Sequence, residues 1–484
     1  MSSKKYSIAI DLGTTTVAAA LIDKKTNKVI LEKSSTNLQY PDFGLDSIKR
    51  IQNGLDKQSV KKLQEKAFLT ISNLLNYFIK ELYIEPADIA EIALAGNTAM
   101  ELAFCGKPLF ELSIPPYRPA FDIIFPKKTS EIGLYMGTKN LTSNLNSADL
   151  TINILSDYSG NNNLSNDDGN KNSDSNKNSD GNSDKNSDKN SDNNNSKDTL
   201  NSDLFIFPIL DGFVGGDTVS SIYYLDLLNR ENPAFIADFG TNVEIAIGNK
   251  NKIFTTSAPA GPAFEGGNIK HGMLAQGSAI SSIELKNGLF NFKTIDGSKI
   301  PEGICGSGII DLMASLLREK IIDKNGRIMP QELIDSESYS VVNSGLNSEE
   351  NEVVIYRNSK TDIRFYQEDV RQFQFAKSAV KSAVEILLNK YKIDINDDFN
   401  VYITGSFGNY IKNENIDIID IFPFKNKKIN YIFDSSLEGC KKYLITAHSI
   451  RTQDISKIMT ISKNFPLSGS KLFEKLFIKN LLWE

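Results

Sequence analysis

With 484 residues, the chain is long enough for two or more domains, each with a sizeable hydrophobic core. Its formal net charge of −6 predicts no basic surface for a nucleic acid or an anionic membrane, so neither is expected as a partner. No apolar run reaches the roughly 18 residues of a membrane span. The N-terminal residues lack the apolar region of a signal peptide, and a cytoplasmic protein is therefore predicted.

Cysteine and histidine are scarce. Cys105, Cys305 and Cys440 lie far apart in the sequence and form no CxxC pair, which argues against a disulfide framework and a tetrahedral zinc site. Four local thiolates for an iron–sulfur cluster are absent from the sequence. Only His271 and His448 remain, so a histidine-based metal site is not expected either.

The predicted elements alternate between strands and helices along the chain. In the first part we expect strands at 6–12, 16–22 and 28–35, a helix at 57–82, a strand at "IAEIALAGN" and a helix from Thr98. Further on we expect strands at 204–210, 234–238, 243–248 and 400–404, and helices at 216–229, 306–320, 367–391 and after Gly408. This mixture predicts an α/β protein.

One stretch, residues 159–203, consists almost entirely of Asn, Ser, Asp, Lys and Gly. Such a composition cannot bury enough apolar surface to order itself, so we predict a disordered insert within a folded domain. Its Asp-rich repeats lack the Gly and Glu positions of an EF-hand loop, which disfavours calcium binding.

Two similar turns each follow a predicted strand: "IDLGTTT" at 10–16 and "DFGTNVE" at 238–244. In such a turn, Gly lets the backbone pass close to a ligand, and backbone N–H groups and Thr hydroxyls can bind phosphate oxygens. Asp11 and Asp238 would repel phosphate unless Mg²⁺, held through water, lies between them. A single copy can be an ordinary hairpin turn. Two copies predict a cleft between two domains that holds one polyphosphate.

The pair of turns resembles the phosphate-1 and phosphate-2 motifs of the actin, sugar kinase and heat-shock chaperone ATPase superfamily. "VYITGSFGNYI" (401–411) resembles its adenosine motif, and the two connecting helices are matched by "GFVGGDTVSSIYYL" (212–225) and "FDSSLEGCKKYL" (433–444). The resemblance implies an α/β, actin-like fold with two ribonuclease-H-like domains around a nucleotide cleft. The first domain would span 1–230 with the insert, and the second 231–484, whose final segment could pack back on the first.

Six further motifs occur in the order found in reductive activators of corrinoid proteins: "GNTAMELAFCG", "FVGGDT", "DFGTNVEI", "APAGPAFEGGNI", "GICGSGIID" and "ITGSFG". The resemblance covers nearly the whole chain outside the insert, including "NLQYPDFGLDSIKRI" (37–51). It implies a protein that binds and hydrolyses ATP with Mg²⁺ and assists reduction of cobalt(II) to cobalt(I). The implied partner is a corrinoid protein or a corrinoid-dependent methyltransferase.

Two departures from that family stand out. Typical activators carry an N-terminal ferredoxin-like domain with a [2Fe–2S] cluster, whereas this sequence reaches the first phosphate turn almost at once. No iron–sulfur cluster is therefore expected in this chain, and a separate electron donor such as a ferredoxin-like protein is implied. The "FDSS" of the second connecting helix also differs from the Asn-rich form expected there.

The resemblance implies roles for individual residues. Asp217 and Asp238 would be catalytic, with Asp217 orienting the attacking water, and Asp11 and Asp238 would hold Mg²⁺ through water. The residues expected at the nucleotide are Asp11, Gly13, Thr14, Thr15, Gly240, Thr241, Asn242, Glu265, Gly266, Gly405 and Gly408.

Simpler interpretations stay open for several of these residues. Asp217 could be only a helix N-cap, Glu265 could cap a helix-entry loop, and Glu244 could face either the cleft or solvent. Two other functions also stay open, a small-molecule kinase of the same superfamily and a nucleotide-gated interaction protein with slow ATP hydrolysis. The sequence does not decide whether the protein forms a homodimer.

Overall fold

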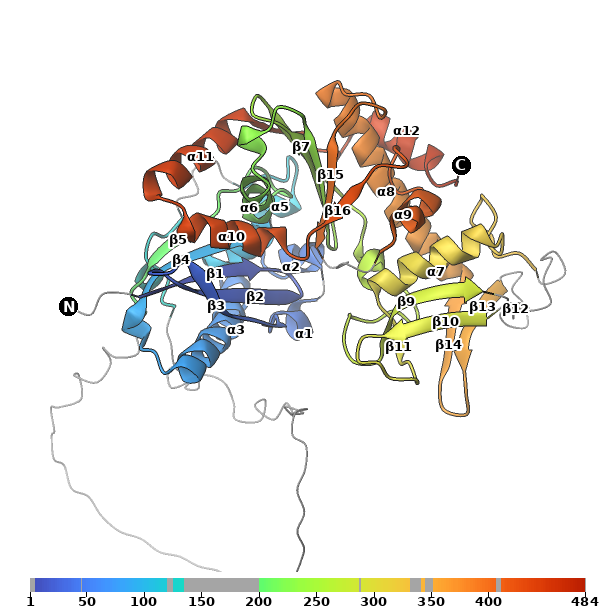
Figure 1. Ribbon diagram of the computed structural model, residues 1–484, viewed down its shortest axis with the longest axis horizontal. Helices are drawn as coiled ribbons and strands as arrows, with labels where there is room; N and C mark the ends of the chain where they lie inside the picture. The colour runs from blue at the N-terminus through green and yellow to red at the C-terminus, as the bar shows by residue number, and fades with distance from the viewer. Residues whose placement is uncertain are drawn as a thin grey trace, which may run out of the picture.

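The computed structural model describes residues 5–44, 46–119, 125–134, 200–286, 289–330, 341–343, 351–405 and 411–483. Two larger sheets organise these residues (Figure 1). The first sheet has the order β3-β2-β1-β4-β5, formed by Lys28–Thr36, Thr16–Asp23, Tyr6–Leu12, Ile89–Gly96 and Asp203–Ile206. β1, β2 and β3 form an antiparallel meander, and β4 and β5 run parallel to β1.

The second sheet repeats this arrangement. Its order is β16-β15-β6-β7-β8-β17, formed by Ile429–Tyr431, Asn400–Gly405, Ala234–Phe239, Val243–Gly248, Ile253–Ala258 and Ser462–Asn464. β6, β7 and β8 form an antiparallel meander, and β15 and β16 run parallel to β6. Each glycine turn therefore connects the first two strands of its own meander, and the recurrence of the turn follows from a repeated topology.

Helices cover these sheets. In the first half they are α1 to α6, at Tyr40–Phe43, Ser47–Gln52, Lys57–Leu82, Thr98–Phe104, Phe110–Ser113 and Gly216–Tyr224. In the second half they are α7 to α12, at Gly306–Arg318, Gln367–Tyr391, Asn413–Ile419, Ser435–Ile445, His448–Ile461 and Lys471–Lys479. Short 3₁₀ turns lie at Pro86–Asp88, Thr129–Glu131, Leu227–Asn229 and Pro262–Glu265.

Two small three-stranded sheets complete the second half. One has the order β10-β9-β11, from Leu289–Thr294, Ala279–Lys286 and Gly303–Ile304. The other has the order β12-β13-β14, from Val341–Asn343, Asn351–Arg357 and Asp362–Tyr366. They lie beside α7, away from the first sheet (Figure 1).

Local sequence explains the long helix α3. The Asp56 side chain accepts hydrogen bonds from the Gln58 and Ser59 N–H groups, which satisfies two of the free donors at the helix start. Buried residues recur at three- and four-residue spacing from Val60 to Phe78, the pattern of a helix with one face on a core. The helix ends at Tyr83, which has the left-handed conformation.

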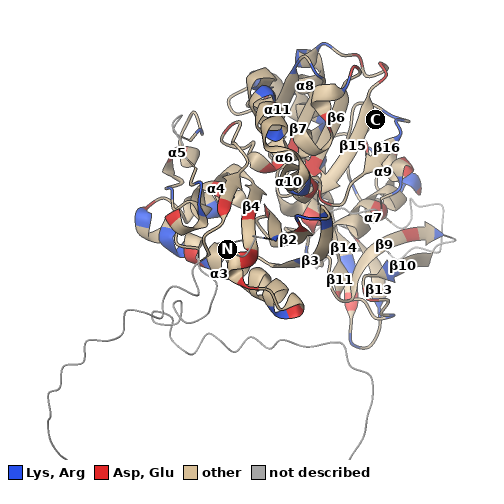
Figure 2. Cartoon of the chain, turned by 60° about the vertical axis from the view of Figure 1, so that its left-hand side comes forward, with Lys and Arg blue, Asp and Glu red and all other residues tan. Residues whose placement is uncertain are grey.

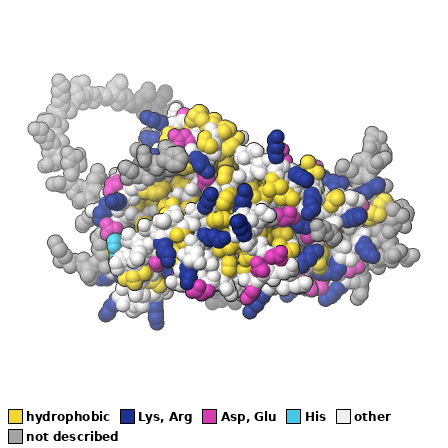
Figure 3. Space-filling model, turned by 90° about the horizontal axis from the view of Figure 1, so that it is seen from above, with side chains coloured by type: hydrophobic (Ala, Val, Ile, Leu, Met, Phe, Trp, Pro, Cys, Tyr) yellow, Lys and Arg dark blue, Asp and Glu magenta, His cyan; other side chains and the backbone are white. Residues whose placement is uncertain are grey.

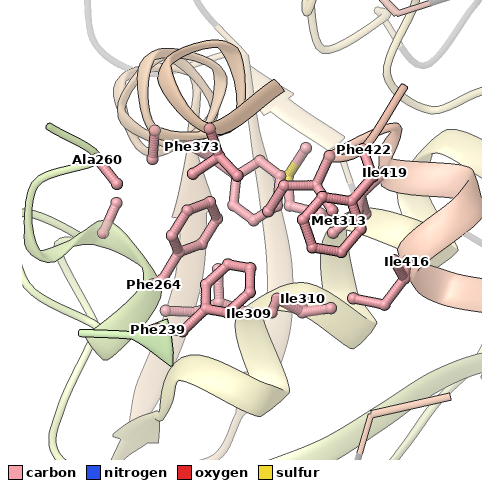
Figure 4. Close-up of a cluster of buried hydrophobic side chains, with 14 of the residues drawn as sticks. Phe239, Ala260, Phe264, Ile309, Ile310, Met313, Phe373, Ile416, Ile419 and Phe422 are labelled. Carbon is pink, nitrogen blue, oxygen red and sulfur yellow. The ribbon is translucent and has the colours of Figure 1, made fainter. Parts of the chain in front are cut away.

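The largest core belongs to the second half and orients the second glycine turn. Phe239 packs edge-on against Phe264, which in turn contacts Phe373 of α8 (Figure 4). Successive side chains of a strand point to opposite faces. The burial of Phe239 in this core therefore directs Asp238, its neighbour on β6, toward the other face of the sheet.

The two halves meet where α6 and α10 cross. The Ser220 hydroxyl donates to the Ser436 carbonyl at 2.7 Å, and a Cβ on Gly439 would lie 2.2 Å from the Ser220 carbonyl oxygen. α10 also reaches β1, where the Cys440 thiol donates to the Ile10 carbonyl at 3.5 Å. Only glycine at 439 allows this close approach, which lets a helix from the second half cover the first sheet.

The predicted domain boundary at 230 falls in the sequence between the strands of the first sheet and those of the second. However, α10 and α11 come after this boundary and pack against the first sheet. The boundary therefore stays a prediction. Most of the predicted insert, residues 159–199, lies outside the described residues. Residues 200–203 belong to the fold, since Leu200 and Ser202 are buried and Asp203 begins β5.

The outer face over α11, α8 and α12 carries hydrophobic side chains scattered among Lys and Arg (Figure 3). Exposed hydrophobic residues of α11 and α12 include Ile450, Leu472 and Ile478. Isolated exposed hydrophobic residues are ordinary on a protein surface. In the described part of the chain, no helix combines the length and the apolar character needed to cross a membrane.

Candidate functional site

Acidic residues from both halves, red in Figure 2, lie in the region of α6 and α10. Asp11 lies on β1, Asp238 on β6, Asp217 in the first turn of α6, and Asp434 is the N-cap of α10. Burial raises the pKa of Asp11 well above its ordinary value, and the charges of Asp434, Asp217 and Asp238 raise it further. Burial also raises the pKa of Asp238 to about 8, with added repulsion from Asp217 and Asp434. The structure thus brings together Asp11, Asp217 and Asp238, which the sequence predicted on separate motifs, and adds Asp434 to them.

Asp217 lies inside the first turn of α6, with a pKa raised to about 6 by burial. A hydrogen bond from the Thr218 N–H at 2.6 Å acts in the opposite direction and lowers the pKa. The N-cap of α6 is Gly215, so the interpretation of Asp217 as the helix N-cap is wrong.

Glu244 belongs to the same acidic group. It pairs directly with Asp238 across β6 and β7, so the two side chains share a face of the sheet. Burial raises its pKa, followed by repulsion from Asp217 and then Asp238, while a hydrogen bond from Ser257 lowers it. Of the two orientations left open by the sequence, Glu244 takes the one that faces the carboxylates.

These carboxylates fit a hydrated divalent cation better than a directly bound one. In the described residues, no three Asp, Glu, His or Cys side chains converge closely enough to hold a metal ion. Burial, followed by the charges of neighbouring carboxylates, raises the pKa values of Asp11 and Asp238, and a nearby cation would relieve that repulsion. Mg²⁺ usually keeps several waters and is bound through one or two carboxylates, which matches this arrangement.

The first glycine turn is held by polar side chains from other segments. A Cβ on Gly13 would lie 2.4 Å from the Thr16 carbonyl oxygen, so the turn requires glycine there. Asn97 donates to the Thr14 hydroxyl oxygen at 2.9 Å, and Asn37 donates to the Gly13 carbonyl at 2.9 Å. Thr14 and Thr15 are half-buried in this turn.

The second glycine turn is closed by a hydrogen bond from the Gly240 N–H to the Asn242 carbonyl at 3.0 Å. The Thr241 hydroxyl donates to Glu265 at 2.8 Å, which brings the "AGPAFEGG" loop against the turn. Gly266 follows with a φ of +85°. Glu265 therefore lies beside the second turn, and its contact with a nucleotide stays a prediction.

Gly405 ends β15 next to the second turn. Its φ is +97°, and a Cβ there would lie 2.3 Å from the Phe239 carbonyl oxygen and 2.6 Å from an Asp238 carboxylate oxygen. The backbone of this predicted adenosine motif thus packs directly on the turn. Gly408, the other predicted glycine of the motif, lies outside the described residues.

Sequence reasoning missed two acidic residues of the site. One is Asp434, in the "FDSS" segment that departs from the family pattern. That departure was the feature of the sequence that could have indicated an additional acidic residue at the site. Glu101 of α4 is fully buried and accepts from the Gly96 N–H at 3.0 Å, and a Cβ on Gly216 would lie 2.2 Å from its carboxylate. Burial, followed by repulsion from Asp217, raises its pKa. Glu101 therefore supports the start of α6 from behind.

Comparisons with known proteins agree with this architecture. A family model for the C-terminal domain of RACo, the ASKHA domain, matches residues 232–484, and one for the RACo middle region matches residues 6–147. The chain is 26% identical over 494 residues to the corrinoid activation enzyme RamQ of Eubacterium limosum, a match that covers 99% of this chain and 70% of RamQ.

A second relative is the [Co(II) methylated amine-specific corrinoid protein] reductase of Methanosarcina barkeri, 24% identical over 304 residues, which covers 58% of this chain and 52% of that protein. Among solved structures, a reductive activator for corrinoid, iron–sulfur protein matches with a TM-score of 0.73 and 26% identity, covering 100% of this chain and 66% of that one. The chain thus spans 52% to 70% of the length of these relatives. Since the ASKHA model alone matches more than half of its residues, the chain belongs to the RACo family of ASKHA proteins.

Proposed function

We propose that this protein binds Mg-ATP between its two glycine turns and uses ATP hydrolysis to assist reduction of cobalt(II) to cobalt(I) in a corrinoid protein. The observation that carries the proposal is the meeting of Asp11, Asp217 and Asp238, from two halves of the fold, in one group with raised pKa values. The relatives named above, which act in corrinoid activation or reduction, supply the substrate class.

Each part of the site has a proposed role. Backbone N–H groups of Thr14, Thr15 and Thr241, together with the hydroxyls of Thr14 and Thr15, bind phosphate oxygens. Asp11 and Asp238 hold the water shell of Mg²⁺, which when bound neutralises phosphate charge and polarises the phosphoryl group. Asp217, with a pKa of about 6, accepts a hydrogen bond from a water molecule and orients it.

Nucleotide binding could favour corrinoid reduction through a conformational change. Shifting a two-state equilibrium from 1:99 to 99:1 requires about 5.5 kcal/mol of differential binding. For one electron, at about 59 mV per tenfold change, this corresponds to roughly 240 mV. α6 and α10 join the two halves where they cross. A ligand that contacts the turns of both halves would therefore favour one relative orientation of these two helices.

Electrons would come from another protein. The sequence holds three cysteines, too far apart in sequence for a local cluster motif. We therefore propose a separate donor, such as a ferredoxin-like protein, as a third component of the reaction.

The test is an anaerobic visible spectrum of cobalt(II) corrinoid protein from the same cells, mixed with this protein and a mild reductant. Mg-ATP should produce the cobalt(I) band, and Asp217→Asn should reduce ATP turnover by about 100-fold or more. Asp23→Asn is the matched control, because Asp23 ends β2 and its side chain accepts hydrogen bonds from the exposed turn that follows, Lys25 and Thr26. ATP hydrolysis with no spectral change would contradict the proposal and favour a small-molecule kinase or a slow nucleotide switch.

A further inference from the structure

The segment "NLQYPDFGLDSIKRI" (37–51) wraps around the first glycine turn on the side of α1 and α2. Three of its polar side chains are almost fully buried, with exposed fractions of 0% for Asn37 and Gln39 and 1% for Arg50. Residues of this kind are rarely buried without a specific partner. Their hydrogen bonds explain why this segment contains them.

Arg50 extends its guanidinium to the first glycine turn. Its Nη2 donates to the Thr14 carbonyl at 2.9 Å, its Nε donates to the Gly44 carbonyl at 2.9 Å, and its Nη1 donates to the Gln39 side chain. None of these acceptors is a carboxylate. Burial lowers the pKa of Arg50 to about 10, against the opposing charge of Asp46, so the side chain stays charged at neutral pH. A buried positive charge thus lies behind the turn, and in the described part of the chain no carboxylate is bonded to it.

The same hydrogen bonds fix the direction of the turn's N–H groups. In a planar trans peptide, the C=O and the following N–H point in opposite directions. Asn37 holds the Gly13 carbonyl and Arg50 holds the Thr14 carbonyl, so the N–H groups of Thr14 and Thr15 point away from both side chains. Among the residues that the structure describes, neither N–H has a hydrogen-bond acceptor. Two adjacent donors are therefore left available for an anion.

We propose that Arg50 is a positioning residue for polyphosphate binding: it fixes the first glycine turn with its N–H groups directed at the phosphates and offsets phosphate charge from behind. The inference rests on the proposed function for its ligand, a nucleoside polyphosphate. The charge argument is strong at this site because the carboxylates of Asp11 and Asp217 would otherwise repel an anion there. A purely structural residue at position 50 would need the hydrogen bonds but not the charge.

The proposal is tested with Arg50→Met, which keeps the length of the side chain and removes its charge and hydrogen bonds. The control is Arg451→Met, because Arg451 is also buried, at 7% exposed, but bonds Glu91 and the Tyr443 carbonyl instead of the turn. The dissociation constant for Mg-ATP is measured by calorimetry, and the melting temperature without nucleotide is measured beside it. Arg50→Met should weaken Mg-ATP binding about tenfold or more, whereas Arg451→Met should lower only the melting temperature.

An unchanged dissociation constant in folded Arg50→Met would overturn the proposal, as would an equal weakening in both variants. Arg50→Lys keeps the charge but loses the forked geometry, and it should weaken binding severalfold. If Arg50→Met does not fold, Arg50→Lys decides, because unchanged affinity in that variant would exclude the positioning role. Binding of Mg-ATP to the unsubstituted protein is measured first. If it does not bind, the proposed function itself is wrong, and this outcome is distinct from a failure of the proposal for Arg50.

Discussion

The two glycine turns have nearly the same sequence and the same place in sheets of matching strand order, yet side chains of opposite charge hold them. The first accepts a hydrogen bond from Arg50 at the Thr14 carbonyl. The second donates one from the Thr241 hydroxyl to Glu265. The repeated topology gives each turn its backbone path, whereas segments that do not repeat give each its surroundings. A motif read from local sequence therefore predicts the shape of a turn but not its electrostatics.

The largest expected loss of stability is at Gly405, whose backbone packs against the second turn. Gly405→Ala would place a Cβ 2.3 Å from the Phe239 carbonyl at a φ of +97°, and both features oppose a side chain. We expect it to lower the free energy of unfolding by about 3 kcal/mol or more. Urea denaturation followed by circular dichroism measures this. A loss below 1 kcal/mol would show that the contact between β15 and the turn is not tight.

The glycines of the two turns should differ from each other. Gly13→Ala would bring a Cβ to 2.4 Å from the Thr16 carbonyl, whereas at Gly240 the nearest atom is the Asn242 carbonyl oxygen at 3.6 Å. We expect Gly13→Ala to destabilise the fold by about 2 kcal/mol and Gly240→Ala by less than about 0.5 kcal/mol. The same denaturation experiment compares them. Equal losses would mean that the two turns are equally constrained after all.

The stability of the Mg²⁺-free protein should depend on pH through Asp238. Its pKa is raised from 3.8 to about 8, so the folded state binds a proton in a range where the unfolded state does not. The melting temperature should therefore fall as pH rises from 6 to 8 in the presence of EDTA. Asp238→Asn should reduce this slope.

Asp23→Asn serves as the control for that slope. Hydrogen bonds from the Thr26 and Lys25 N–H groups lower the pKa of Asp23, so its contribution is lost only at acid pH. The slope between pH 6 and 8 should stay the same in this variant. A slope that persists in Asp238→Asn would assign the pH dependence to other groups of the site.

The smallest effect concerns the hydrogen bond from Thr241 to Glu265. Thr241→Val keeps the shape of the side chain and removes the donor, and we expect a loss of about 1 kcal/mol in the free energy of unfolding. Glu265→Gln keeps an acceptor and removes the charge, so it should cost less. Mg-ATP binding to Glu265→Gln is measured separately. Stronger binding in this variant would show that the negative charge of Glu265 beside the second turn repels the phosphates.

The sequence was sufficient to predict most of the fold, because strand alternation, helix periodicity and glycine turns are local signals. The α/β class, the first two hairpin strands and the helices at 57–82 and 367–391 are confirmed. Local patterns also placed Asp11, Asp217 and Asp238 correctly at the ends of their elements. Their roles at a nucleotide stay predictions.

What could not be predicted depends on contacts between distant segments. Ser436 donates to Asp11 at 2.6 Å across 425 positions of sequence, and no periodicity signals such a pair. Arg50 lies in a segment that was recognised only by resemblance, and its link to Thr14 appears once α2 is placed behind the turn. Such partners become visible only when the packing of the whole chain is known.

The helix that completes the first sheet is also among the last to be made. α10, at Ser435–Ile445, covers β1, and its Cys440 packs with Ala9 and Val219 of the first half in one core. At the ribosome, at about 5–20 residues per second, the chain between the end of β5 and the end of α10 takes roughly 10 to 50 seconds to synthesise. Throughout that interval, the nascent first half leaves this apolar surface uncovered. The first sheet can therefore acquire this covering helix only after residues 435–445 have been translated, so its core is completed late in synthesis.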